Sequence, residues 1–172
     1  PWPLRSVAEG VTDEDILAQV TAEEMRYYGN ETDSFIREVR NEAAQHRLAT
    51  DAQATGAAMI IGLVSNEIHK DRPRTYNSAA FSRPDLGYVG KYDKNHLVMF
   101  GEYIPLRSIA PWLADLTPFG PNFGLDHGTE FKLFDYAGFR IAPLICFEDT
   151  VPHLVRRMAA LKDSEGKSCD VM

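Results

Sequence analysis

This sequence of 172 residues has little cysteine, no long hydrophobic run and no excess of basic residues. Its two cysteines, Cys146 and Cys169, are too few for a disulfide scaffold or for a zinc site built on cysteine pairs. The longest apolar run covers residues 57–64, far fewer than the roughly 20 that a membrane-spanning helix requires. Lys and Arg total 18 against 25 Asp and Glu, without a basic cluster, so we expect no nucleic-acid-binding surface.

Metal and cofactor sites are not indicated either. The five histidines are scattered, and none pairs with another at the spacing of a helical metal-binding motif. We therefore expect no metal and no cofactor. The sequence has no initiator Met and stops inside what reads as an apolar strand. From this we expect residues 1–172 to be a single partial domain, truncated at both ends.

The sequence does contain helical patterns with capping residues. Apolar spacing predicts a short helix near residues 12–20 and a longer one over residues 34–54, which Gly56 ends. A last helix is expected to begin near Val151, with Thr150 as its cap and Pro152 in its first turn.

Strands are predicted next to one another rather than in alternation with helices. The run at residues 57–64 indicates a strand buried on both faces, and further strands are expected at residues 75–81 and 87–92. A hairpin is expected from residues 131–136 and 139–146. Because the strands are adjacent, the predicted fold class is mixed α/β (α+β), a sheet covered by helices and not a doubly wound repeat.

Cys146 is the first candidate for chemistry, because it lies where an apolar strand is expected to lead into a helix. The partial positive charge and free N–H groups of a helix start favour a reactive thiolate. The backbone N–H that follows Cys146 could also face a developing oxyanion. Taken alone, the feature slightly favours the simpler interpretation of a small cysteine buried in a strand.

Lys94, Glu102 and Glu148 are the charged candidates. Lys94 follows an expected strand, and Glu102 comes shortly after it, beyond a glycine. A lysine held near a carboxylate stays charged and can donate to an anionic intermediate. Glu148 lies two positions after the cysteine. The simpler interpretation is a solvated Lys and Glu on a loop, with Glu148 as an ordinary carboxylate at a helix start.

Two segments together resemble the nitrilase superfamily. Tyr-Asp-Lys-Asn-His-Leu-Val at residues 92–98 resembles its lysine motif, and Phe-Gly-Glu-Tyr-Ile-Pro at residues 100–105 resembles a tail specific to the apolipoprotein N-acyltransferase branch. Ile-Cys-Phe-Glu at residues 145–148 is similar to the nucleophile motif of that branch. The motifs occur in the expected order.

The resemblance implies a fold and a reaction. The chain would form part of a four-layer αββα sandwich. Cys146 would take a fatty acyl group from a phospholipid as a thioester, which the N-terminal amine of a diacylglyceryl-cysteine apolipoprotein then attacks. Lys94 would stabilise the oxyanion, Glu102 would orient Lys94, and Glu148 would support the nucleophile. The domain would lie on the periplasmic side of the bacterial inner membrane, anchored through segments outside this chain.

The resemblance is incomplete in ways that bear on activity. The general-base glutamate of the family has no match, and its motif would lie before Pro1, so we expect the chain alone to be nearly inactive. Met99 stands where Pro is usual, and Phe147 where Tyr is frequent. A truncated sandwich would leave sheet edges and apolar surface unpaired, which favours self-association.

Two other functions remain open from the sequence. A soluble nitrilase-type amidohydrolase would resolve the thioester with water, although such enzymes usually lack the tail at residues 100–105. A catalytically silent binding or scaffold module would use Cys146 only as a core residue. Selective alkylation of Cys146 over Cys169 would argue against the silent module.

Overall fold

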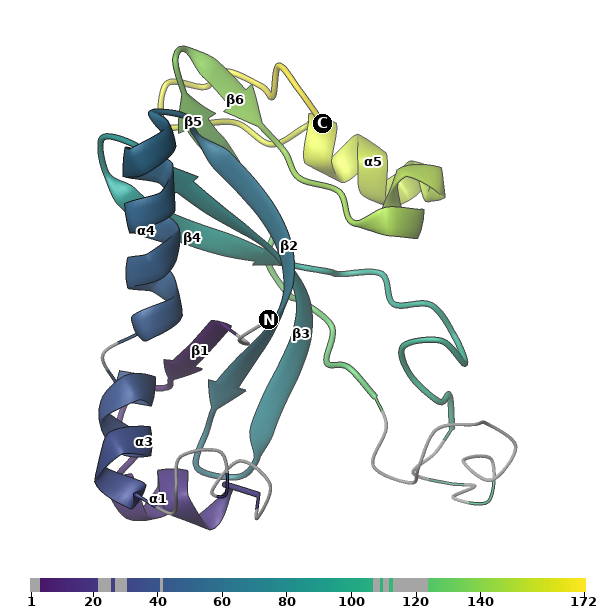
Figure 1. Ribbon diagram of the computed structural model, residues 1–172. Coiled ribbons are helices and arrows are strands. Elements are labelled where there is room, and N and C mark those ends of the chain that lie inside the picture. Colours follow the sequence, from purple (N-terminus) through teal and green to yellow (C-terminus); the bar gives the residue numbers. More distant parts are fainter. Residues whose placement is uncertain are drawn as a thin grey trace. The chain divides into compact units, whose positions relative to one another are not determined.

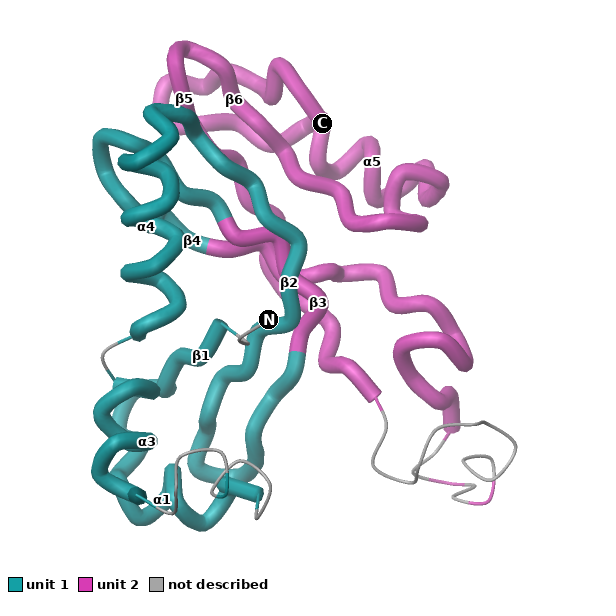
Figure 2. The backbone as a smooth tube through the Cα atoms, viewed as in Figure 1, with its two compact units in different colours: residues 1–75, 81–90 teal, residues 76–80, 91–172 magenta. Residues whose placement is uncertain are grey.

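The computed structural model describes residues 4–21, 26, 31–40, 42–106, 109, 112 and 124–172. These residues divide into two compact units, one comprising Pro1–Thr75 with Phe81–Gly90 and the other Tyr76–Ala80 with Lys91–Met172 (Figure 2). The helices and strands, labelled in Figure 1, are β1 (Leu4–Val7), α1 (Asp13–Ala18), α3 (Thr32–Arg40), α4 (Ala43–Thr55), β2 (Met59–Ile68), β3 (Pro73–Arg83), β4 (Gly87–Asp93), β5 (Phe134–Tyr136), β6 (Phe139–Ile141), η2 (Cys146–Thr150) and α5 (Pro152–Ala159).

Strand pairing confirms the predicted mixed α/β class. Four strands form one sheet in the order β1-β2-β3-β4, and β5 pairs with β6 in a second sheet. The β1 and β2 strands are parallel, with Leu4 opposite Ser65 and Val7 opposite Ile68. The strands expected at residues 75–81 and 87–92 are present as β3 and β4, and each extends beyond its predicted range.

The first unit has its own apolar core beside β1 and β2. The buried members of this core are Val11, Ile16, Phe35, Val39 and Ile68. Helix α1 begins as predicted, because the Asp15 amide donates to the Thr12 hydroxyl at 3.2 Å and the Thr12 amide donates back to the Asp15 carboxylate at 2.9 Å. This reciprocal capping box satisfies donors that a helix start otherwise leaves open.

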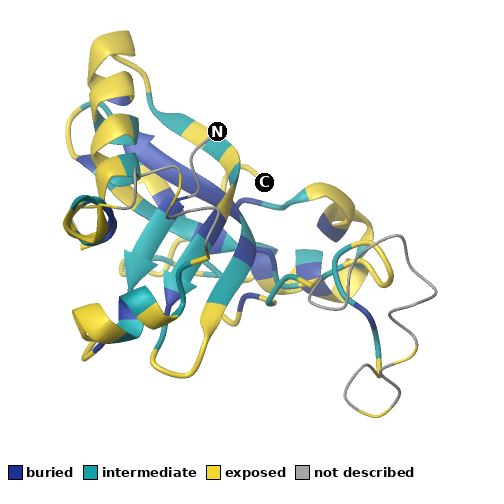
Figure 3. Ribbon diagram, turned by 60° about the horizontal axis from the view of Figure 1, so that its bottom comes forward, coloured by how far each residue is buried: buried dark blue, intermediate teal, exposed yellow. Residues whose placement is uncertain are grey.

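The single helix predicted over residues 34–54 is wrong, because two helices occupy this segment. Glu42 precedes α4 in the left-handed conformation, with φ of 51°. A left-handed residue interrupts the helical hydrogen-bond ladder, and no Pro or Gly marks this break in the sequence. Helix α3 buries Phe35 and Val39, whereas α4 buries only Ala52 and is otherwise largely exposed (Figure 3). Gly56 ends α4 as predicted, with φ of 66°.

The strand expected at residues 57–64 is displaced and is not buried on both faces. It runs as β2 from Met59 to Ile68, and its first six residues alternate between partly buried and exposed. Ile60 and Val64 remain 45% and 48% exposed. An uninterrupted apolar run therefore marks the strand correctly but does not show how many of its faces are covered.

The second unit contains the predicted hairpin and the last helix, with shorter strands than expected. Ala137 and Gly138 both adopt positive φ between β5 and β6, as the tightest hairpin turns require. Strand β6 ends at Ile141, so Cys146 does not end a strand but begins the short 3-10 helix η2.

Helix α5 begins next to the predicted position. Pro152 occupies its first turn as expected, but the cap is Val151 and not Thr150. The Thr150 hydroxyl donates instead to the Phe147 carbonyl at 2.8 Å, within the preceding turn. Leu154 and Met158 are the buried residues of α5. Within the described ranges, no helix is both long enough and apolar enough to cross a membrane.

Candidate active site

Lys94 and Glu102 form a buried ion pair directly after β4. The Lys94 side chain is 1% exposed, and its ammonium group donates to both Glu102 carboxylate oxygens, at 2.9 and 2.8 Å. An ammonium group without a partner is costly to bury, so the bidentate contact is what allows a charged lysine at this depth. The interpretation of these two residues as a solvated pair on a loop is therefore wrong.

Glu102 is held by two more donors. It accepts hydrogen bonds from the Asn77 side-chain amide at 3.0 Å and from the Val98 backbone amide at 2.9 Å. Partial burial acts to raise the pKa of Glu102, but the hydrogen bonds from Lys94, Val98 and Asn77 outweigh it and bring that pKa below its ordinary value. Glu102 is therefore ionised at neutral pH.

Asn77 is a residue of this site that the sequence did not reveal. It lies in β3, where its carbonyl accepts the Lys94 backbone amide at 2.8 Å while its side chain donates to Glu102. One residue thus fixes both the backbone of the lysine and the carboxylate that pairs with it. Its only sequence signal is a polar side chain within a predicted strand.

Glu148 joins the two motifs. Its carboxylate is fully buried and accepts backbone N–H bonds from Asn95 at 2.8 Å, His96 at 3.0 Å and Ile145 at 2.9 Å. Two of these donors follow Lys94 in sequence, and the third directly precedes Cys146. The interpretation of Glu148 as an ordinary carboxylate at a helix start is therefore incomplete, because it also binds the backbone of the segment that follows Lys94.

Tyr92 completes the environment of Glu148. Its hydroxyl donates to the carboxylate, at 3.0 and 3.1 Å from the two oxygens. Burial raises the pKa of Tyr92, and the nearby charge of Glu148 raises that pKa further, so the hydroxyl remains a donor. Tyr92 belongs to the motif at residues 92–98, but no role for it could be predicted from the sequence.

Cys146 is exposed, which contradicts the interpretation of a cysteine buried in the core. It has φ of 55°, a left-handed conformation that costs a residue with a side chain about 1–3 kcal/mol. Strain of this kind is characteristic of sites where the chain must present a side chain in a fixed direction. In the described part of the chain, no hydrogen bond joins its thiol to Lys94, Glu102 or Glu148.

Gly128 allows a distant segment to lie against the lysine backbone. Its amide donates to the Lys94 carbonyl at 2.8 Å. A Cβ atom at this position would lie 2.1 Å from the Asp93 carbonyl oxygen, so only glycine fits without displacement of the backbone.

The described residues include no group of three His, Cys, Asp or Glu side chains that could hold a metal ion.

Comparison with known proteins identifies the family. The carbon-nitrogen hydrolase family model matches residues 20–165. An apolipoprotein N-acyltransferase of Rhodopirellula baltica is 39% identical over 95 residues, which cover 55% of this chain and 16% of that protein. One from Bdellovibrio bacteriovorus is 33% identical over 118 residues, covering 65% of this chain and 22% of that protein. The chain therefore spans about a fifth of the length of these curated relatives or less.

Solved structures with a similar course include an amidase from Nesterenkonia sp. AN1. It is 20% identical in sequence, with a TM-score of 0.47 over 88% of this chain and 45% of that chain. The family match extends over most of the sequence and includes Lys94, Glu102, Cys146 and Glu148. The chain belongs to the carbon-nitrogen hydrolase family.

Proposed function

We propose that this chain is part of an N-acyltransferase that moves a fatty acyl group from a phospholipid to the N-terminal amine of a diacylglyceryl-cysteine apolipoprotein. The observation that carries the proposal is the buried Glu148 carboxylate, which binds the backbone beside both Lys94 and Cys146. The motif at residues 100–105 and the curated relatives named apolipoprotein N-acyltransferase support the acyltransferase reading over an amidohydrolase.

Cys146 acts as the nucleophile in this proposal. Its thiolate attacks the ester carbonyl of the phospholipid, and collapse of the tetrahedral intermediate expels the lysophospholipid alkoxide, which takes up a proton. The acyl group is then held as a thioester. The amine of the apolipoprotein attacks this thioester, loses a proton and becomes an amide, and the Cys146 thiolate is released.

The charged residues act on the intermediates. Lys94 donates to the oxyanion that forms in each step, and Glu102 orients the ammonium group through two hydrogen bonds. Glu148 holds the backbone on both sides, so that the segments that carry Lys94 and Cys146 keep one geometry. Asn77 and Tyr92 are positioning residues in this scheme, because they act through Glu102 and Glu148.

The setting of the enzyme is also a proposal. We infer that residues 1–172 contribute to one nitrilase-like domain on the periplasmic side of a bacterial inner membrane, with a phospholipid donor and an apolipoprotein acceptor. Exposed apolar residues on β2, such as Ile60 and Val64, support self-association of the chain in isolation. Sedimentation velocity that gives a single monomer across a wide concentration range would contradict the self-association.

Acyl capture tests the nucleophile directly. The chain is incubated with 4-nitrophenyl palmitate, an activated ester that lowers the demand for a general base, and intact mass spectrometry follows the acyl adduct. We expect one hydroxylamine-sensitive palmitoyl group, lost in Cys146→Ser and retained in the matched variant Cys169→Ser. Equal labelling of both cysteines, or labelling of Cys169 alone, would rule out Cys146 as a selected nucleophile.

The fate of the adduct separates transfer from hydrolysis. The acylated chain is mixed with a peptide whose N-terminal residue is diacylglyceryl-cysteine, and the peptide is analysed for an amide-linked acyl group. Release of free fatty acid without acylated peptide would favour the amidohydrolase. Lys94→Met should slow the capture of acyl groups by about 10²-fold or more, since it removes a charged oxyanion donor.

A further inference from the structure

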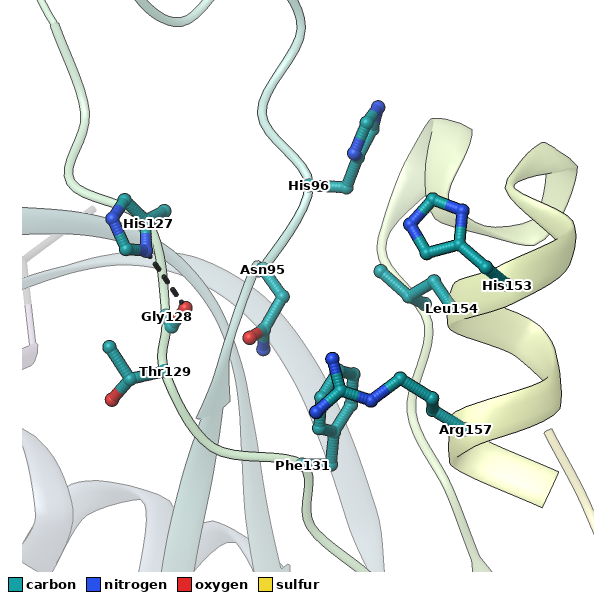
Figure 4. Close-up of a pocket in the computed structure, with 9 residues that line it drawn as sticks. All are labelled: Asn95, His96, His127, Gly128, Thr129, Phe131, His153, Leu154 and Arg157. Atoms are coloured by element: carbon teal, nitrogen blue, oxygen red, sulfur yellow. Dashed lines mark hydrogen bonds between the residues drawn. The ribbon is translucent and has the colours of Figure 1, made fainter. Parts of the chain in front are cut away.

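A cavity with a basic lining lies in the second unit, next to the segment that follows Lys94. Its volume is about 320 Å³, and its lining residues come from three stretches of the chain, shown in Figure 4. The first stretch provides Asn95 and His96, the second provides residues 127–129 and Phe131, and α5 provides the third. None of Lys94, Glu102, Cys146 and Glu148 lines this cavity.

The charge of the lining is unusual for this chain. The lining contains His96, His127, His153 and Arg157, and it contains no Asp or Glu, whereas the whole sequence has a formal net charge of −7. Glu148, a carboxylate of the candidate active site, accepts the backbone amides of Asn95 and His96 and is not part of the lining. Arg157 therefore gives the lining a positive charge that no lining carboxylate opposes.

Arg157 is held in place without a carboxylate partner. Its guanidinium group lies over the Phe131 ring, 4.5 Å from the ring centroid. In the part of the chain that the structure describes, Arg157 makes no ion pair or hydrogen bond. A guanidinium group stacked on a ring keeps its in-plane N–H donors available, and these donors match the oxygens of a phosphate.

The imidazoles supply further donors around the same space. His96 and His153 lie edge to face with ring centroids 6.4 Å apart, and His127 lies on the opposite side of the cavity in Figure 4. Nδ1 of His127 lies 3.1 Å from the Gly128 carbonyl oxygen, and its Nε2 is left for a ligand, to which it can donate only when the ring carries both protons. Among the residues that the structure describes, these three histidines do not lie close enough together to form a metal site. Imidazole donors on two sides and a guanidinium suit an anion with several oxygens.

We infer that this cavity, framed by His96, His127, His153 and Arg157, binds a phosphate group. The phosphate could belong to a lipid headgroup or to a small soluble molecule, since both present the same anionic oxygens to these donors. The inference does not depend on the proposed function, because it involves neither Cys146 nor Lys94.

Inorganic phosphate is the first probe. The imidazole resonances of the chain are followed by NMR during a phosphate titration at constant ionic strength, with His96→Gln and His153→Gln used for assignment. We expect saturable shifts of His96, His127 and His153. Arg157→Gln should weaken binding by about tenfold, because it removes a charged donor, whereas the matched change Arg156→Gln, on the same helix but outside the cavity, should alter it less than about twofold.

Vesicles distinguish the two sources of phosphate. If the ligand is a lipid headgroup, phosphatidylglycerol vesicles will perturb the same imidazoles, and Arg157→Gln will remove that effect while Arg156→Gln keeps it. If the ligand is soluble, inorganic phosphate alone will perturb them. The inference is overturned if neither probe gives saturable shifts of these three histidines, or if the two arginine variants lose binding equally. Arg157 is exposed, and matching circular dichroism spectra will show that its variant folds.

Discussion

The hydroxyl of Tyr92 donates to the carboxylate of Glu148 across 56 positions of sequence, and both side chains are buried. Because the same carboxylate also accepts the amides of Asn95, His96 and Ile145, it is surrounded by four donors. A buried carboxylate with this many donors is stable only while all of them remain in place. The lysine and cysteine motifs are therefore coupled through one side chain.

Loss of Glu148 should loosen both motifs at once. Glu148→Ala leaves three backbone N–H groups without their acceptor, and we expect the free energy of unfolding to fall by at least about 3 kcal/mol. Tyr92→Phe removes one donor and should cost about 1 kcal/mol. Urea titrations measure both, and the neighbouring exposed change Asp149→Asn is the control.

Amide hydrogen exchange locates this effect. The amides of Asn95, His96 and Ile145 should lose protection together in a destabilised but folded variant such as Glu148→Gln. If only Ile145 exchanges faster, Glu148 merely caps η2 and does not couple the two motifs.

The buried ion pair should respond differently to single and double changes. Glu102→Leu leaves the Lys94 ammonium group buried without its carboxylate, which should cost about 3–5 kcal/mol. The double variant Lys94→Met with Glu102→Leu removes the uncompensated charge and should be more stable than the single one. Glu165→Leu, at an exposed pair with Lys167, should have little effect in the same urea titrations. A double variant no more stable than Glu102→Leu would contradict this account of the pair.

The segments that form the candidate site were easier to predict from the sequence than the contacts that hold them together. The Lys94 and Cys146 segments could be found because their residue types and order are conspicuous. The hairpin turn and the approximate start of the last helix were predicted correctly, whereas the hairpin strands are shorter than predicted and the cap is Val151. Asn77 and Gly128 could not be found, since their roles come from contacts with residues distant in sequence. The break at Glu42 has no local sequence signal, since neither Pro nor Gly marks it.

The exposure of Cys146 illustrates the same limit. An apolar strand predicts a buried cysteine, but the strand stops at Ile141 and the chain turns into η2 with a left-handed Cys146. Periodicity reports which faces of an element are apolar, and it does not report a strained residue at the end of that element.

Gly128 should tolerate no side chain. Gly128→Ala places a Cβ 2.1 Å from the Asp93 carbonyl, so either the backbone of β4 or the segment at Gly128 must move. We expect a loss of about 2 kcal/mol or more in the free energy of unfolding, with slower acyl capture at Cys146 if Lys94 shifts with its carbonyl. Gly62→Ala, where nothing lies within 4 Å of the added carbon, is the matched control. Equal stability of the two variants would show that the close approach at Gly128 relaxes without cost.

Acid should release the end of the chain from the β5–β6 hairpin. Arg140 binds Asp170 with two side-chain hydrogen bonds of 2.8 Å and lies 3.4 Å from Asp163. Backbone N–H bonds are the largest cause that lowers the pKa of both aspartates, from Arg140 for Asp170 and from Lys167 for Asp163, and the Arg140 side chain lowers both further. Since the folded pKa values lie below the unfolded value of 3.8, these contacts stabilise the fold above that pH and are lost as the pH falls through the folded values. Urea midpoints are measured from about pH 6 down to pH 2.5. They should fall more steeply with pH in the wild type than in Asp170→Asn. The control Lys132→Gln, which changes an exposed pair with Glu130, should follow the wild type. Parallel curves for wild type and Asp170→Asn would mean that the acid sensitivity arises elsewhere in the chain.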